Sequence, residues 1–116
     1  MKIKTGIDIM EKKRFLESYE KGGEKFSSRI FTHQELKQNS KEQLASIFSM
    51  KEAIIKALQL PQSSWQVIST NRKGNGKVEC SFTDEKIARK IKSLDTSISH
   101  DGGFIIAIAA AILENE

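Results

Sequence analysis

The stretch from Lys41 to Leu58 has the apolar spacing of one long helix, and it constrains the fold more than any other part of the chain. Its apolar side chains recur every three or four residues and form a single stripe: Leu44, Ile47, Phe48, Ile54, Ile55 and Leu58. Pro61 marks the end of this element. A chain of 116 residues is long enough for one compact core, so we expect a single domain over residues 1–116.

Residues 2–10 have the alternating pattern of a strand, in which successive side chains point to opposite faces. Asp8 lies on one face and projects toward water or a binding site. Gly6 lies on the same face two residues earlier, where it leaves room for something bulky. The other face, which we expect to be buried, carries three isoleucines: Ile3, Ile7 and Ile9.

Helix signals follow this strand. A helical pattern over residues 11–21 is interrupted at Gly22-Gly23, because glycine favours the end of a helix. Thr32 and Glu35 then have the spacing of a capping box, which predicts a short helix to about Lys37.

The second half of the chain favours strands around one more helix. Residues 65–70 and 77–82 fit a hairpin with Asn75-Gly76 as its turn signal. Residues 104–113 fit a strand buried on both faces, although their alanines also favour a helix. Residues 96–100 fit a further strand, and a helix before it would carry on one face Ile87, Ile91 and Leu94. These elements predict an α+β fold, a small antiparallel sheet packed against the long helix.

Charge and cysteine content leave several function classes open. The 19 lysines and arginines against 15 acidic residues give a net charge of +4, which suits a nucleic acid, a phosphate-rich cofactor or an acidic protein partner. Cys80 is the only cysteine and fits a small buried hydrophobe. A single cysteine fits a cytoplasmic location. The longest apolar run, residues 104–113, is too short to span a bilayer as a helix.

Three charged residues of the long helix are candidates for a metal-binding or phosphate-binding site. Glu52 and Lys56 are four residues apart, so both side chains leave one side of the helix. A carboxylate can hold a hard metal ion and an ammonium can neutralise phosphate, although such pairs are also common on solvated helix faces. Lys51 falls inside the apolar stripe, so either its tip reaches water or it has an anionic partner.

Five segments together resemble the 4′-phosphopantetheinyl transferase superfamily, and most closely its small holo-acyl-carrier-protein synthases. They cover nearly the whole chain in the family's order: residues 6–15, 26–32, 48–58, 75–77 and 97–100. The resemblance implies Mg²⁺-dependent transfer of the phosphopantetheine arm of coenzyme A to a serine of an acyl carrier protein. The other product would be adenosine 3′,5′-bisphosphate. It also implies a homotrimer with active sites at subunit boundaries.

The resemblance assigns roles to particular residues. Asp8 and Glu52 match the magnesium ligands, and Lys56 matches a lysine that stabilises or protonates the leaving group. Asp8, Glu52 and Lys56 are therefore the expected catalytic residues. Positions lining the coenzyme A site are matched by Ser97, Ser99 and His100, and Lys51 and Lys56 are expected to bind the cofactor with them. For Lys51 the partner would be a cofactor phosphate or a site carboxylate, unless it supports the helix instead. Arg14 and Arg29 match basic positions that face the acidic carrier protein.

The chain departs from the family pattern at a few positions. Lys4 stands where glycine is frequent, and Val78 stands where proline is usual. Ile47 stands where an arginine commonly precedes the phenylalanine of the helix motif. Either coenzyme A binding would weaken, or the lost phosphate contact would move to Lys4 or Lys73. Because Asp8, Glu52 and Lys56 remain, we expect a divergent but active member.

Two other readings remain open at this point. A diverged homologue would bind coenzyme A or the carrier protein without transferring the arm. A small basic protein could instead bind nucleic acid, although the chain has no recognition-helix signature and its basic residues are interleaved with acidic ones. We expect neither nucleic acid nor membrane as a partner.

Overall fold

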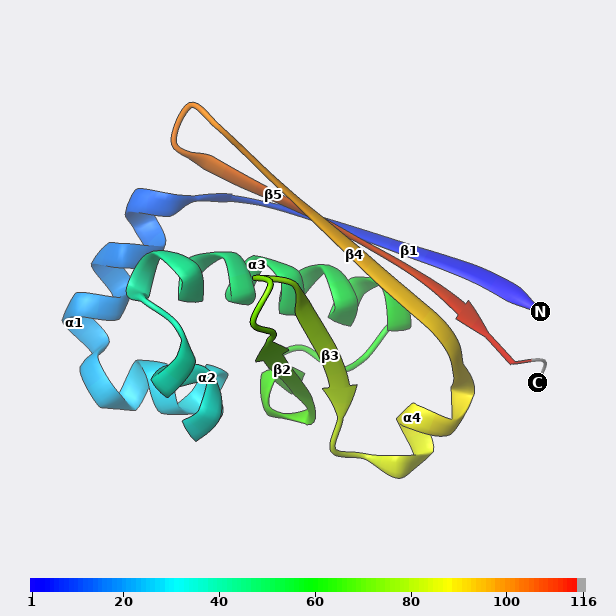
Figure 1. Ribbon diagram of the computed structural model, residues 1–116. Helices are drawn as coiled ribbons and strands as arrows, with labels where there is room; N and C mark the ends of the chain where they lie inside the picture. Colours follow the sequence, from blue (N-terminus) through cyan, green and yellow to red (C-terminus); the bar gives the residue numbers. More distant parts are fainter. Residues whose placement is uncertain (115–116) are drawn as a thin grey trace.

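The computed structural model describes residues 1–114 and has an α+β architecture (Figure 1). The elements are, in chain order, β1 (Lys2–Glu11), α1 (Lys12–Ile30), α2 (His33–Gln38), α3 (Lys41–Leu58), the 3₁₀ helix η1 (Ser64–Val67), β2 (Ile68–Arg72), β3 (Val78–Phe82), α4 (Glu85–Lys90), β4 (Ile91–Asp101) and β5 (Phe104–Leu113). Three antiparallel strands form one sheet in the order β1-β5-β4, while β2 and β3 form a separate hairpin. Helix α3 lies along one face of the larger sheet, which confirms the predicted fold class.

The sheet face that covers α3 carries a group of small side chains on β1 and β5, so the helix approaches closely there. Gly6 pairs with Ala109 across β1 and β5. A Cβ atom at Gly6 would lie 2.1 Å from the carbonyl oxygen of Ala53. The bulky neighbour expected beside Gly6 is therefore α3 itself. The remaining small residues of this face are Ala107 and Ala111, both fully buried.

The outer face of the same sheet is apolar and uncovered in a single copy of the chain. Its exposed residues come from β1 and β5: Ile3, Ile7, Ile9, Phe104, Ile106 and Ile108. The expectation that the β1 isoleucines are buried was wrong for the single chain, because the strand turns its Gly6 and Asp8 side toward α3. Strand β5 likewise buries only one face, on which Ile105, Ala107, Ala109 and Ala111 lie.

Local signals predicted several element boundaries. Residues 41–58 form a helix as expected, and Gly23 interrupts α1 with a φ of 54°. The capping box of Thr32 and Glu35 is also confirmed. Residues 65–67 form part of a 3₁₀ helix rather than a strand.

The predicted helical placement of Ile91 and Leu94 was wrong. Both residues belong to β4, where each pairs with a residue near the end of β5. Pairing with this long neighbouring strand overrides the local helical spacing. Within residues 1–114, no helix combines the length and the apolar character needed to cross a bilayer.

Candidate functional site

Asp8 from β1 and two residues of α3 form a charged cluster where the strand packs on the helix. The Nζ atom of Lys56 donates a hydrogen bond to the carbonyl oxygen of Ile7 at 3.0 Å and lies 3.5 Å from Oδ1 of Asp8. The other oxygen of Asp8, Oδ2, accepts a hydrogen bond from the buried Ser49 hydroxyl at 2.9 Å. Glu52 lies close enough for the two carboxylates to repel each other.

This arrangement changes the ionisation of Glu52. Its burial raises its pKa, and the negative charge of Asp8 raises it further. The indole N–H of Trp65 and the ammonium of Lys56 act in the opposite direction. The N–H of the indole presents its positive end to the Glu52 carboxylate and so favours the ionised carboxylate. The contact is not a hydrogen bond, since the buried Nε1 of Trp65 has no hydrogen-bond partner among residues 1–114. A cation bound between the two carboxylates would offset their electrostatic repulsion.

The chemistry of these donors fits magnesium better than a metal that needs an all-protein cage. Within residues 1–114, no group of three or more His, Cys, Asp or Glu side chains is placed to hold a metal. Magnesium is usually held by one or two carboxylates, with waters and substrate phosphates completing its shell. Asp8 and Glu52 supply that number of carboxylates, and Lys56 adds a cation for phosphate.

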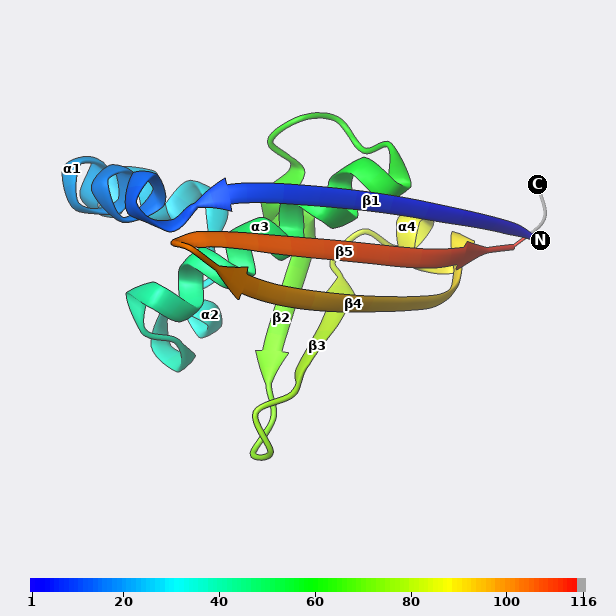
Figure 2. The same cartoon turned by 90° about the horizontal axis from the view of Figure 1, so that it is seen from above.

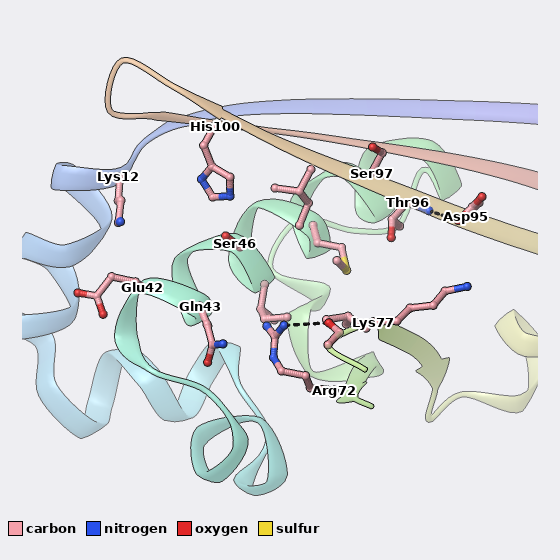
Figure 3. Close-up of a pocket in the computed structure, with 15 residues that line it drawn as sticks. Lys12, Glu42, Gln43, Ser46, Arg72, Lys77, Asp95, Thr96, Ser97 and His100 are labelled. Carbon is pink, nitrogen blue, oxygen red and sulfur yellow. Dashed lines mark hydrogen bonds between the residues drawn. The ribbon is translucent and has the colours of Figure 1, made fainter. Parts of the chain in front are cut away.

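A second candidate region is a pocket of about 470 Å³ on the β4 side of the molecule (Figure 3). It lies between the first half of α3, the β2–β3 hairpin and β4. Ser97 and His100 line it, as expected for residues of one binding site. Three basic side chains that come from different elements also line it: Lys12, Arg72 and Lys77.

The charged cluster and the pocket are on different sides of one chain. Asp8 lies on β1 and His100 on β4, the two edge strands of the sheet, with β5 between them (Figure 2). The pocket is lined by none of Asp8, Glu52 and Lys56. Ser99 does not line it either. One copy of the chain therefore does not bring all the expected site residues together.

Lys51 has an anionic partner, but this partner is Glu35 and not a cofactor. Its Nζ atom lies 2.8 Å from Glu35 Oε1, 2.8 Å from the carbonyl oxygen of Ile30 and 3.2 Å from that of Trp65. Burial lowers the pKa of Lys51, while the hydrogen bond to Glu35 opposes that shift. The side chain has no exposed surface. The expected contact between Lys51 and coenzyme A is therefore contradicted.

The basic residues expected to replace the missing arginine are placed elsewhere. Lys73 pairs with Glu79 at 3.2 Å, and neither Lys73 nor Lys4 lines the pocket. Arg72 does line the pocket. It was missed from the sequence, because Asn71, Arg72 and Lys73 are three consecutive polar residues before a turn and their order does not reveal which side chain points inward. Arg14 and Arg29 are exposed on α1, where a partner protein can reach them.

Comparison with known proteins agrees with this fold and shows the family to which the chain belongs. The model of the 4′-phosphopantetheinyl transferase superfamily matches residues 4–109. A holo-[acyl-carrier-protein] synthase of Dehalococcoides mccartyi is 34% identical over 92% of this chain and 96% of its own length. The crystal structure of the Helicobacter pylori synthase in complex with coenzyme A superposes with a TM-score of 0.82 at 31% identity, over 93% of this chain and 99% of that one. The synthase of Neisseria meningitidis gives a TM-score of 0.80 at 26% identity, over 94% and 97%.

Proposed function

The chain belongs to the 4′-phosphopantetheinyl transferase superfamily, in its holo-[acyl-carrier-protein] synthase branch, and we propose that it transfers the 4′-phosphopantetheine group of coenzyme A to a serine of an acyl carrier protein. The observation that carries this proposal is the cluster of Asp8, Glu52 and Lys56. The reaction requires Mg²⁺ and releases adenosine 3′,5′-bisphosphate. Residues 1–116 act as one transferase domain, in the cytoplasm.

The reaction is a displacement at phosphorus. The serine Oγ of the carrier protein forms a bond to the phosphorus of the phosphopantetheine arm, while the bond from that phosphorus to the oxygen it shares with the 5′-phosphate breaks. Asp8 and Glu52 would hold Mg²⁺, which neutralises phosphate charge when bound. Lys56 stabilises or protonates the leaving 5′-phosphate. The serine proton passes to Glu52 or to water.

The family resemblance implies a homotrimer, and two features of the chain support association of copies with active sites at the subunit interfaces. The outer sheet face exposes six large apolar side chains, and contiguous apolar surface of this kind often marks a protein–protein contact. The charged cluster and the pocket are on different sides of one chain, so a neighbouring copy can bring the two together. In this arrangement the pyrophosphate of coenzyme A lies at the cluster of one copy and its nucleotide in the pocket of another.

The carrier protein would approach the basic side chains of α1. Arg14 and Arg29 are both exposed on this helix, which also carries several lysines. Acyl carrier protein is the acidic partner that the family resemblance implies. Charge complementarity of this kind speeds the encounter and selects the partner more than it adds affinity.

The direct test is a mass-shift assay on apo acyl carrier protein with coenzyme A and Mg²⁺. We expect the carrier protein to gain the mass of phosphopantetheine, and EDTA to stop the reaction. Asp8→Asn and Glu52→Gln should abolish the shift while circular dichroism shows a folded chain. Binding of coenzyme A without any shift across a panel of carrier proteins would identify a diverged homologue and overturn the proposal.

A further inference from the structure

Arg72 is held in the pocket by neutral partners. Its Nε atom donates a hydrogen bond to Asn39 Oδ1 at 2.8 Å, and one terminal nitrogen donates to the carbonyl oxygen of Gly76 at 3.2 Å. Its backbone N–H donates to Gln38 Oε1 at 3.0 Å. These contacts orient the guanidinium but do not neutralise it. Among residues 1–114, no carboxylate lies within 4.0 Å of it.

The middle of the pocket is therefore basic. Figure 3 shows the Arg72 guanidinium between Gln43 and Lys77, while the two acidic side chains, Glu42 and Asp95, lie toward opposite ends. A guanidinium has five N–H donors in a planar fork, and Arg72 uses two of them within the chain. The remaining donors suit a phosphate monoester, whose oxygens match the spacing of the fork.

Resting on the proposed function, we propose that Arg72 recognises the 3′-phosphate of coenzyme A. The pyrophosphate of coenzyme A belongs at Asp8, Glu52 and Lys56, so the 3′-phosphate is the remaining anionic group to be placed. Ile47 also lines the pocket, but its apolar side chain offers no donor. Arg72 reaches the same pocket from the β2–β3 hairpin and supplies the donor that α3 lacks at that position.

Recognition by Arg72 would set specificity and not the chemical step. The 3′-phosphate takes no part in the bond that breaks, so its contact contributes to ground-state and transition-state binding alike. Loss of such a contact raises KM and leaves kcat unchanged. The same contact should distinguish coenzyme A from 3′-dephospho-coenzyme A.

Calorimetric binding of two nucleotides tests this without relying on transfer. Adenosine 3′,5′-bisphosphate and adenosine 5′-monophosphate differ only in the 3′-phosphate. For Arg72→Gln we expect the Kd of the bisphosphate to rise roughly 10- to 100-fold, the loss typical of a hydrogen bond to a charged group, with the Kd of the monophosphate unchanged. Arg89→Gln is the matched control, because Arg89 is exposed on α4 and pairs with Glu85. Its two Kd values should equal those of the wild type.

Kinetics then separate the two proposals. In the mass-shift assay, Arg72→Gln should raise the KM for coenzyme A by a similar factor. Its kcat, and its KM for 3′-dephospho-coenzyme A, should stay within twofold of the wild-type values. Equal weakening of both nucleotides, or of neither, would overturn the role of Arg72. A wild-type chain that prefers the bisphosphate but transfers nothing would overturn the proposed function alone. If Arg72→Gln does not fold, Arg72→Lys takes its place, with the same selective loss expected.

Discussion

The ammonium of Lys51 lies 2.8 Å from Oε1 of Glu35, and neither side chain has any exposed surface. Oε2 of the same carboxylate accepts hydrogen bonds from the backbone N–H and the hydroxyl of Thr70. Oε1 also accepts from the backbone N–H of Thr32. This buried pair therefore joins α2, α3 and β2, and its Lys51 immediately precedes the catalytic candidate Glu52.

Replacing Lys51 with methionine should destabilise the chain by about 3–5 kcal/mol, the usual cost of leaving one member of a buried ion pair without its partner. Equilibrium unfolding in urea measures the change. Lys41→Met is the matched control, since Lys41 and Glu20 form an exposed pair that should contribute less than about 1 kcal/mol. A loss at Lys51 no larger than the loss at Lys41 would contradict a structural role for the buried pair.

Glu52→Gln should abolish transfer without destabilising the free chain. Burial and the charge of Asp8 raise the pKa of Glu52 in the folded state. The folded chain then binds this proton more tightly than the unfolded chain does, so stability falls as pH rises from about 4.3 through the raised folded pKa. Glutamine carries no charge, so the Glu52→Gln variant does not lose stability in this way. Because Glu52 is half-exposed, we expect only a small rise in Tm, about 1–3 °C at pH 7.5.

Thermal unfolding at pH 4 and pH 7.5 provides the check. At pH 4 the wild-type carboxyl is largely protonated, so wild type and Glu52→Gln should unfold at similar temperatures. A variant that is less stable than the wild type at pH 7.5 would show that the carboxylate stabilises the free chain, contrary to the expected sign.

Local signals explain which parts of the fold could be predicted. The apolar periodicity of α3 and the capping box of Thr32 and Glu35 depend only on residues that are close together in the sequence. The burial of β1 could not be predicted, because the isoleucine face is as apolar as a core face and only the contact between Gly6 and α3 decides the matter. Ile91 was misplaced for a related reason, since its partner Leu113 is distant in the chain.

The candidate site follows the same division. Asp8, Glu52 and Lys56 were expected together from family resemblance, and they do lie together. Arg72 could not be found, because the β2–β3 hairpin reaches the pocket through contacts with residues more than thirty positions away, such as Asn39. Sequence patterns also gave no sign that the partner of Lys51 is a carboxylate of α2.

Ser49→Ala should weaken metal binding more than it weakens the fold. The Ser49 hydroxyl orients Asp8 Oδ2, and loss of a group that positions a metal ligand typically costs 10- to 100-fold in metal affinity. Calorimetric titration of Mg²⁺ into the chain with coenzyme A measures the change, and we expect roughly a tenfold rise in Kd. Ser81→Ala, at an exposed position of β3, is the control. Equal Mg²⁺ affinity in both variants would show that Asp8 needs no support from Ser49.

Ile7→Lys should dissociate the proposed trimer and leave each copy folded. Ile7 is 60% exposed in the single chain, so lysine costs little there, whereas a subunit interface would have to desolvate its charge. Light scattering after gel filtration should report a monomer, with an unchanged circular dichroism spectrum and lost transfer. Gln62→Lys, at an exposed position outside the sheet, should remain a trimer. A trimeric Ile7→Lys variant would place the interface elsewhere.

Mixed trimers test whether one active site takes residues from two copies. Asp8→Asn removes a metal-ligand candidate from the cluster, and Arg72→Gln impairs the pocket. If each site joins the cluster of one copy to the pocket of the next, some interfaces of a mixed trimer combine an intact cluster with an intact pocket. In a cyclic trimer that contains both variants, one interface, about a third of the total, is fully wild type.

Co-expression of the two variants with different tags, followed by purification through both tags, isolates the mixed trimers. At a coenzyme A concentration far below the KM of the Arg72→Gln variant, we expect clear transfer activity in the mixed trimers and little in either parent. If the cluster and the pocket of one copy served the same site, each site would carry one defect, and the mixed trimers would be no more active than the mean of the parents. That result would require coenzyme A to span from β1 to β4 within one chain.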